Sequence, residues 1–149
     1  IPSMAAHIAP DLFDPGFDQA AVVANLRTRK SKIKSAILDQ QILSGIGNIY
    51  ADESLWAAKI HPERICGDLS AKKINLLIDS AREIMARALE SGGTSFDDLY
   101  INVNGESGYF EVQLEVYGCE GEPCSRCSRL IKRISFANRS SHFCPYCQK

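Results

Sequence analysis

The stretch SKIKSAILDQQILSGIGNIYADESLWAA, residues 31–58, decides the fold of this 149-residue chain. Apolar residues at helical spacing predict one helix from a Ser31 cap to Ser44, where Gly45-Ile46-Gly47 must end it. Asn48 then predicts the cap of a second helix, from Ile49 to about Ala58. The result is two helices joined by a glycine-rich turn. The apolar residues that define the first helix are Ile33, Ile37, Leu38 and Ile42.

Working outward, we expect three parts. Residues 1–18 carry proline and turn signals and form a linker, residues 19–118 form a helical domain, and residues 119–149 form a small β-hairpin with four cysteines. The predicted fold class is therefore mainly α, a helical bundle followed by a small β-hairpin. Nothing indicates an obligate dimer, so a monomer is expected.

Two further helices complete the bundle. Asp18 is expected to cap a helix over residues 19–30, and an apolar stripe predicts the longest helix over residues 70–91, with Gly92-Gly93 as its C-cap. We interpret the stripe as core packing and not as a binding face. Its members are Ile74, Leu77, Ile78, Ala81, Met85, Ala88 and Leu89.

The composition is typical of a globular protein and gives no sign of a membrane span or a signal peptide. The apolar fraction of 45% and the charged fraction of 23% are ordinary for a globular domain. No apolar run approaches the ~20 residues of a membrane span, and the opening Ile1-Pro2-Ser3-Met4 lacks the features of a signal peptide. A cytoplasmic location is expected, and the start without an initiator methionine suggests a fragment of a longer protein.

Four cysteines predict a metal site. Cys124-x-x-Cys127 and Cys144-x-x-Cys147 are separated by sixteen residues, a spacing typical of zinc. Four thiolates fill a tetrahedral shell and leave no position for water, so the one Zn²⁺ is structural. The alternative is a pair of disulfides, which a cytosolic chain disfavours. Cys66 and Cys119 lie outside the pattern and are expected to be free thiols.

Charge is segregated although the net charge is −1. Residues 124–149 hold six basic residues and no acidic one, and residues 130–144 predict a hairpin with Arg139 at its tip. A guanidinium held there suits a phosphate, although many zinc ribbons bind protein instead. The basic run at 27–34 alone is read as a solvated helix face rather than a binding site.

The turn Gly45-Ile46-Gly47-Asn48 has the outline of an anion site. Glycines let a ligand approach the backbone, and the N–H groups of the following helix point toward it. Ile46 would anchor the turn in the core, and Asn48 would both cap the helix and offer its amide to a phosphate. The alternative is an ordinary corner between helices.

Together these motifs resemble the formamidopyrimidine-DNA glycosylase/endonuclease VIII family, from about Asp18 to the end. The resemblance implies a helix–two-turns–helix domain and a zinc finger. It also implies a base-excision enzyme that flips an oxidised purine, such as formamidopyrimidine or 8-oxoguanine, from damaged duplex DNA, cleaves its glycosidic bond and nicks the strand. The matching segments are LDQ at 38–40, SGIGNIYADESL at 44–55, GGTS at 92–95, NGESGYF at 104–110, VYG at 116–118, GEPC at 121–124 and the closing residues 139–148.

The resemblance also assigns roles residue by residue. Asn48 and Arg139 would hold DNA phosphates, and Lys34 would approach the damaged nucleoside. Thr94, Ser95 and Tyr100 belong to the segment that would close over the flipped base. That segment is one residue longer than the commonest family loop, and its acidic pair Asp97-Asp98 is unusual near DNA.

No catalytic residue is assigned. The family's nucleophile is a proline at the processed N-terminus, assisted by residues of an N-terminal domain, whereas Pro2 follows Ile1 and is interpreted as part of the linker. The lysines lie in polar runs with no sign of burial, and Lys34 is the one weak Schiff-base candidate. The chain is therefore expected to bind DNA but to be inactive alone. The alternatives are a freestanding non-enzymatic DNA-binding module and a zinc ribbon that binds protein.

Overall fold

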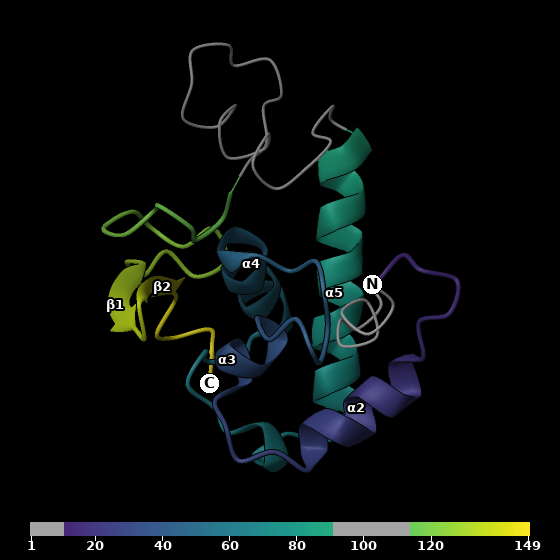
Figure 1. Ribbon diagram of the computed structural model, residues 1–149. Coiled ribbons are helices and arrows are strands. Elements are labelled where there is room, and N and C mark those ends of the chain that lie inside the picture. Colours follow the sequence, from purple (N-terminus) through teal and green to yellow (C-terminus); the bar gives the residue numbers. More distant parts are fainter. Residues whose placement is uncertain (1–10, 91–113) are drawn as a thin grey trace.

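The computed structural model describes residues 11–90 and 114–149. Its helical part precedes a two-stranded antiparallel sheet, so the predicted fold class is confirmed (Figure 1). None of the described helices is long and apolar enough to cross a membrane. The elements are α2 (Gln19–Arg27), α3 (Ile33–Ile37), α4 (Asn48–Ala58), the 3₁₀ turn η1 (Cys66–Asp68), α5 (Ala71–Glu90), β1 (Lys132–Phe136) and β2 (Arg139–Phe143).

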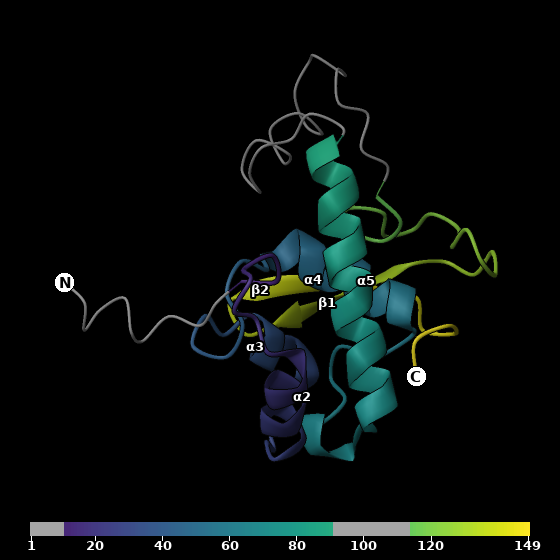
Figure 2. The same ribbon diagram turned by 90° about the vertical axis from the view of Figure 1, so that its right-hand side faces the viewer.

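Helix α4 lies between the other elements. Helix α5 packs along one of its sides and strand β2 along another, as Figures 1 and 2 show. One continuous apolar core joins α2, α3, α4 and α5. The predicted stripe of α5 faces this core, except that Leu89 is 50% exposed. The stripe is therefore core packing, as expected, and the core holds α4 in place for the hairpin.

The expected bounds of two helices are wrong. The helix expected over residues 19–30 is α2, which ends at Arg27 with Thr28 as its C-cap. The helix predicted over residues 31–44 is only the short α3, because Asp39 ends it: the Asp39 carboxylate accepts the Gln41 N–H at 2.9 Å and forms a local turn. Ile42 and Leu43 are buried in the core from this turn, which is why their spacing imitated a longer helix. Lys32, and not Ser31, is the N-cap of α3.

Of the two other predicted N-caps, one is confirmed and one is wrong. Asp18 caps α2 as expected, since its carboxylate accepts the Ala21 N–H at 3.1 Å. The N-cap of α4 is Gly47 and not Asn48, so the cap residue itself offers no side chain to the first N–H groups of that helix.

The hairpin is shorter at its turn than expected. Phe136 pairs with Arg139, which leaves Ala137 and Asn138 as a two-residue turn. Ala137 has φ +54°, a conformation that favours glycine. Arg139 is thus the exposed first residue of β2, directly after the turn and not within it.

Candidate functional site

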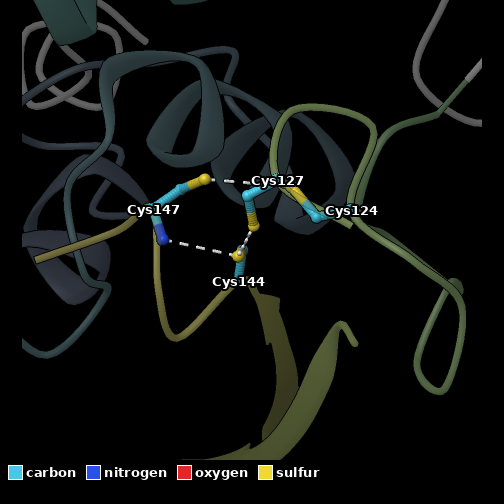
Figure 3. Close-up of side chains that lie close together, drawn as sticks. All are labelled: Cys124, Cys127, Cys144 and Cys147. Carbon is cyan, nitrogen blue, oxygen red and sulfur yellow. Dashed lines mark hydrogen bonds between the residues drawn. The ribbon is translucent and has the colours of Figure 1, made fainter. Parts of the chain in front are cut away.

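The four predicted cysteines meet at one point (Figure 3). Their sulfur atoms all lie within 4.8 Å of one another, with Cys127 and Cys144 at 3.5 Å and Cys124 and Cys147 at 3.9 Å. Sulfur atoms around a tetrahedral zinc ion with 2.3 Å bonds are about 3.8 Å apart. The cysteines are free thiols and not disulfides. The donor set and its spacing therefore fit one structural zinc ion.

Neighbouring N–H groups support the thiolate form. The Trp56 indole donates to Cys124 Sγ at 3.4 Å, and the Cys147 N–H donates to Cys144 Sγ at 3.4 Å. Burial raises the pKa of Cys124, but N–H groups, that of Trp56 first, lower it to about 6. Trp56 comes from α4, so the helical part takes part in the surroundings of the metal site.

The other two cysteines are also free thiols, as predicted. Burial raises the pKa of Cys66, which lies in the helical core. Burial and nearby carboxylates raise the pKa of Cys119 to about 11. Neither belongs to the four-cysteine cluster.

A second cluster forms around the carbonyl oxygen of Ser140. Lys34 Nζ donates to this oxygen at 3.0 Å and Asn48 Nδ2 at 3.1 Å. Arg139 is the neighbouring residue on β2 and is exposed. Three residues singled out in the sequence, from α3, α4 and β2, therefore lie together beside the start of α4, where Gly47 is the N-cap.

The Lys34 side chain is fully buried, contrary to the expectation of a solvent-exposed lysine. Its exposed fraction is 0%, and its ammonium lies 2.7 Å from the Asp52 carboxylate and 5.2 Å from the centre of the Phe136 ring. Burial lowers the pKa of Lys34, Asp52 opposes this change, and Arg139 adds to it. The ammonium is therefore enclosed by protein atoms in this structure.

The rest of the basic run fits the interpretation of a solvated face. Arg27, Arg29, Lys30 and Lys32 are exposed, and Lys32 pairs with Glu63 at 3.3 Å. Lys34 is the exception because it lies on the short helix α3 between Ile33 and Ala36, which are both buried in the core.

The glycine-rich turn has the conformation that its sequence requires. Gly45 has φ +98°, and its N–H donates to the Gln40 side chain at 3.1 Å. Ile46 is buried, as predicted. Asn48 does not cap the helix: one of its amide N–H groups serves Ser140, and its Oδ1 is buried without a hydrogen-bond partner among the described residues. One N–H of this amide remains for a ligand.

Sequence reasoning missed the two acidic residues that hold the hairpin part to α4. The Asp52 carboxylate accepts the His142 N–H at 2.9 Å, and the Glu53 carboxylate accepts the N–H groups of Val116 and Tyr117 at 2.9 Å. Burial raises the pKa of Glu53, whereas the backbone N–H donors lower it. The signal was available in the sequence, because adjacent acids in an otherwise apolar helical run suggest buried, paired carboxylates.

The C-terminal residues fasten the other end of α4. Gln148 donates from Nε2 to the Ile60 carbonyl at 3.0 Å and accepts the Cys144 N–H at 2.7 Å. Arg126 stacks on the Trp56 ring at 3.7 Å and donates to the Trp56 carbonyl. The finger, residues 114–149, therefore contacts α4 from its first turn to its last.

The third group of predicted site residues is Thr94, Ser95 and Tyr100. These residues lie outside the described ranges, as do Gly92-Gly93 and the family-matching segment at 104–110.

Comparison with known proteins gives consistent matches over both parts. Residues 8–99 match the family described as formamidopyrimidine-DNA glycosylase H2TH domain, and residues 121–149 match the zinc finger found in FPG and IleRS. The chain is 55% identical over 149 residues to a formamidopyrimidine-DNA glycosylase of Mycobacteroides abscessus, covering 100% of this chain and 52% of that protein. It is 57% identical over 148 residues to that of Mycolicibacterium gilvum, covering 99% and 52%.

Solved structures show the same arrangement. A formamidopyrimidine-DNA glycosylase of Lactococcus lactis, non-covalently bound to DNA that contains an AP site, matches with a TM-score of 0.84 and 41% identity over 98% of this chain and 52% of that one. MutM in complex with DNA that contains carbocyclic 8-oxo-G matches with a TM-score of 0.81 and 40% identity over 98% and 52%. The chain thus spans about half the length of the relatives it matches.

Proposed function

The chain belongs to the formamidopyrimidine-DNA glycosylase family, and from this premise we propose that it is the DNA-binding half of a base-excision repair enzyme. In this proposal the whole protein removes formamidopyrimidine and 8-oxoguanine from damaged duplex DNA and then nicks the strand as an AP lyase. Its partners are the damaged duplex and an N-terminal catalytic domain. Disulfides are rare in the cytosol, so four cysteines kept as thiolates for zinc favour the cytoplasm.

One observation carries the proposal for this chain. The exposed Arg139, the remaining amide N–H of Asn48 and the glycine-capped start of α4 lie together around Ser140. A guanidinium and a helix N-terminus side by side form a site for a phosphate, because both present N–H donors with positive charge. The turn residues Gly45 and Gly47 would let the DNA backbone approach. The burial of Lys34 gives it a supporting role beneath this surface and not a direct contact with the lesion.

We also propose that the chain binds DNA without cleaving it. Schiff-base chemistry needs an accessible neutral amine. Lys34, the lysine considered for this role, is enclosed and paired with Asp52. Thr94, Ser95 and Tyr100 keep their proposed place over the flipped base by resemblance alone.

Binding to a duplex with a central abasic-site analogue, measured by fluorescence anisotropy at two salt concentrations, tests the proposal. Affinity should fall steeply with salt, because phosphate contacts release counterions. Arg139→Ala should weaken binding by about 1–3 kcal/mol, the cost of a charge-assisted hydrogen bond. Lys73→Ala removes the same charge from the exposed surface of α5 and is the matched control. Unchanged binding by Arg139→Ala at low salt would remove Arg139 from the interface, and a zinc module that binds only protein would show no salt-dependent binding.

Borohydride trapping on duplex DNA with a true abasic site tests the second proposal. Binding without a trapped adduct is expected. A covalent adduct would show that an amine of this chain performs lyase chemistry, and Lys34→Met would then identify or exclude Lys34.

A further inference from the structure

Asp52 is the central residue of a buried polar cluster between α4 and β2. It is 1% exposed, and its Oδ1 lies 2.7 Å from Lys34 Nζ and accepts the Ser141 hydroxyl at 3.2 Å. Its Oδ2 accepts the His142 N–H at 2.9 Å and lies 3.2 Å from His142 Nδ1. The two oxygens of one carboxylate therefore divide these contacts: Oδ1 holds Lys34 of α3 and Ser141 of β2, and Oδ2 holds His142 of β2.

The cluster fixes the start of β2. Through Lys34, Asp52 also supports the Ser140 carbonyl, to which Lys34 donates at 3.0 Å. Ser140, Ser141 and His142 are consecutive, and all three are held in this way. Arg139 precedes them and follows a turn in which Ala137 has φ +54°. A strand that starts next to a strained turn needs contacts of this kind to keep one conformation.

The adjacent Glu53 gives a natural comparison. Its carboxylate is also buried, but it accepts the N–H groups of Glu115, Val116 and Tyr117 at 2.8–2.9 Å. These residues precede the first zinc-binding cysteine and lie far along the chain from Arg139. Two neighbouring acids of one helix thus anchor two different segments of the finger.

We propose that Asp52 is a positioning residue for DNA binding: by holding residues 140–142 of β2, it fixes the place from which the Arg139 guanidinium reaches a phosphate. The inference rests on the proposed function for the DNA contact, but the ordering of β2 can be tested without DNA. Asp52 itself touches no DNA in this proposal and acts through Arg139.

A double-mutant cycle separates this role from a general loss of stability. Asp52→Asn keeps the shape of the side chain but leaves the Lys34 ammonium without its counter-charge, so β2 should lose its fixed start. We expect DNA affinity to fall by about tenfold in the native background and by less than about twofold in the Arg139→Ala background, since coupled residues are not additive. Equal losses in both backgrounds would overturn the proposal.

Glu53→Gln is the matched control for this cycle. It removes a buried charge from the next residue of α4 and should destabilise the finger, but any effect on affinity should be the same with and without Arg139. If Asp52→Asn does not fold, Lys34→Met combined with Asp52→Asn removes the unpaired charge, and neutral replacements of buried pairs are often tolerated. That double variant should show the same dependence on Arg139, and independence from Arg139 would overturn the proposal.

Amide hydrogen exchange supplies the measurement without DNA. Asp52→Asn should speed exchange at Ser140, Ser141 and His142, whereas Glu53→Gln should speed it at residues 115–117. Unchanged exchange at His142 in Asp52→Asn would overturn the positioning role whether or not the chain binds DNA. Absence of DNA binding by the native chain, with the expected exchange pattern, would instead contradict only the proposed function and the part of the inference that depends on it.

Discussion

The helical part and the finger are stabilised by different means. A continuous apolar core runs through α2, α3, α4 and α5. The finger has a small apolar cluster of Val116, Ile131 and two cysteines that are themselves metal ligands, and it lies on α4 through buried carboxylates. A module of this size cannot bury enough apolar surface to fold alone. The comparison teaches that the helices should tolerate loss of the metal and that the finger should not.

Removal of zinc is expected to have the largest effect and tests the comparison directly. A structural zinc ion contributes on the order of 10 kcal/mol to a small finger. A chelator, or Cys127→Ser, should therefore abolish the hairpin resonances in NMR spectra while the helical circular dichroism at 222 nm persists. Addition of excess zinc after the chelator should restore the hairpin. Loss of helical signal together with the metal would show that the two parts form one cooperative unit.

A cavity in the helical core should have the converse effect. Leu77 is 1% exposed, and Leu77→Ala should lower the free energy of unfolding by about 2–5 kcal/mol. Urea denaturation followed by circular dichroism measures this loss, and the zinc content of the folded protein should stay unchanged. Leu76→Ala is the control, because Leu76 is 47% exposed and its replacement should cost less than about 0.5 kcal/mol. Zinc loss in Leu77→Ala would contradict the separation of the two parts.

Trp56 tests how far the two parts are joined at the metal. Trp56→Phe keeps an aromatic ring under Arg126 but removes the N–H that donates to Cys124. Zinc transfer to a chromogenic chelator should become roughly tenfold faster, as when outer partners of metal ligands are lost. Tyr146→Phe, on the exposed second knuckle, should release zinc at the native rate. Equal rates in Trp56→Phe and the native chain would show that the indole only packs.

Alkaline pH should weaken the helical part by a smaller amount. Burial raises the pKa of Tyr50 to about 12. Between pH 10 and 12 the unfolded chain releases the phenolic proton while the folded chain retains it, so stability is present below pH 10 and is lost as the pH rises. The loss from this group should be about 1 kcal/mol at pH 11. Urea denaturation at pH 7 and pH 11 should show this difference in the native chain but not in Tyr50→Phe. If Tyr50→Phe loses as much stability between the two pH values as the native chain, Tyr50 is not the origin of the loss.

Local patterns predicted part of this structure well. The spacing of Cys124, Cys127, Cys144 and Cys147 predicted the metal site, because two tight turns with paired thiolates have few other uses. The stripe of α5 predicted a core helix because its apolar period was long and regular. Both signals come from residues near one another in the chain.

Long-range polar contacts could not be predicted in the same way. Lys34 is buried where it donates to the Ser140 carbonyl, and Ser140 lies 106 positions away in the sequence. No local pattern indicates such a contact. Asp39 ends α3 although the apolar spacing continues, since its side chain competes for the backbone N–H groups. The site around Ser140 was therefore predicted as three separate residues, and Asp52, which joins them, was missed.

The adjacency of Asp52 and Glu53 bears on how the protein can change over generations. One turn of α4 holds both the start of the finger and its hairpin, so these contacts help set the position of the finger on α4. Residues 91–113 form the covalent path from α5 to the finger. Two neighbouring codons, for Asp52 and Glu53, therefore specify how both segments of the finger are held on α4.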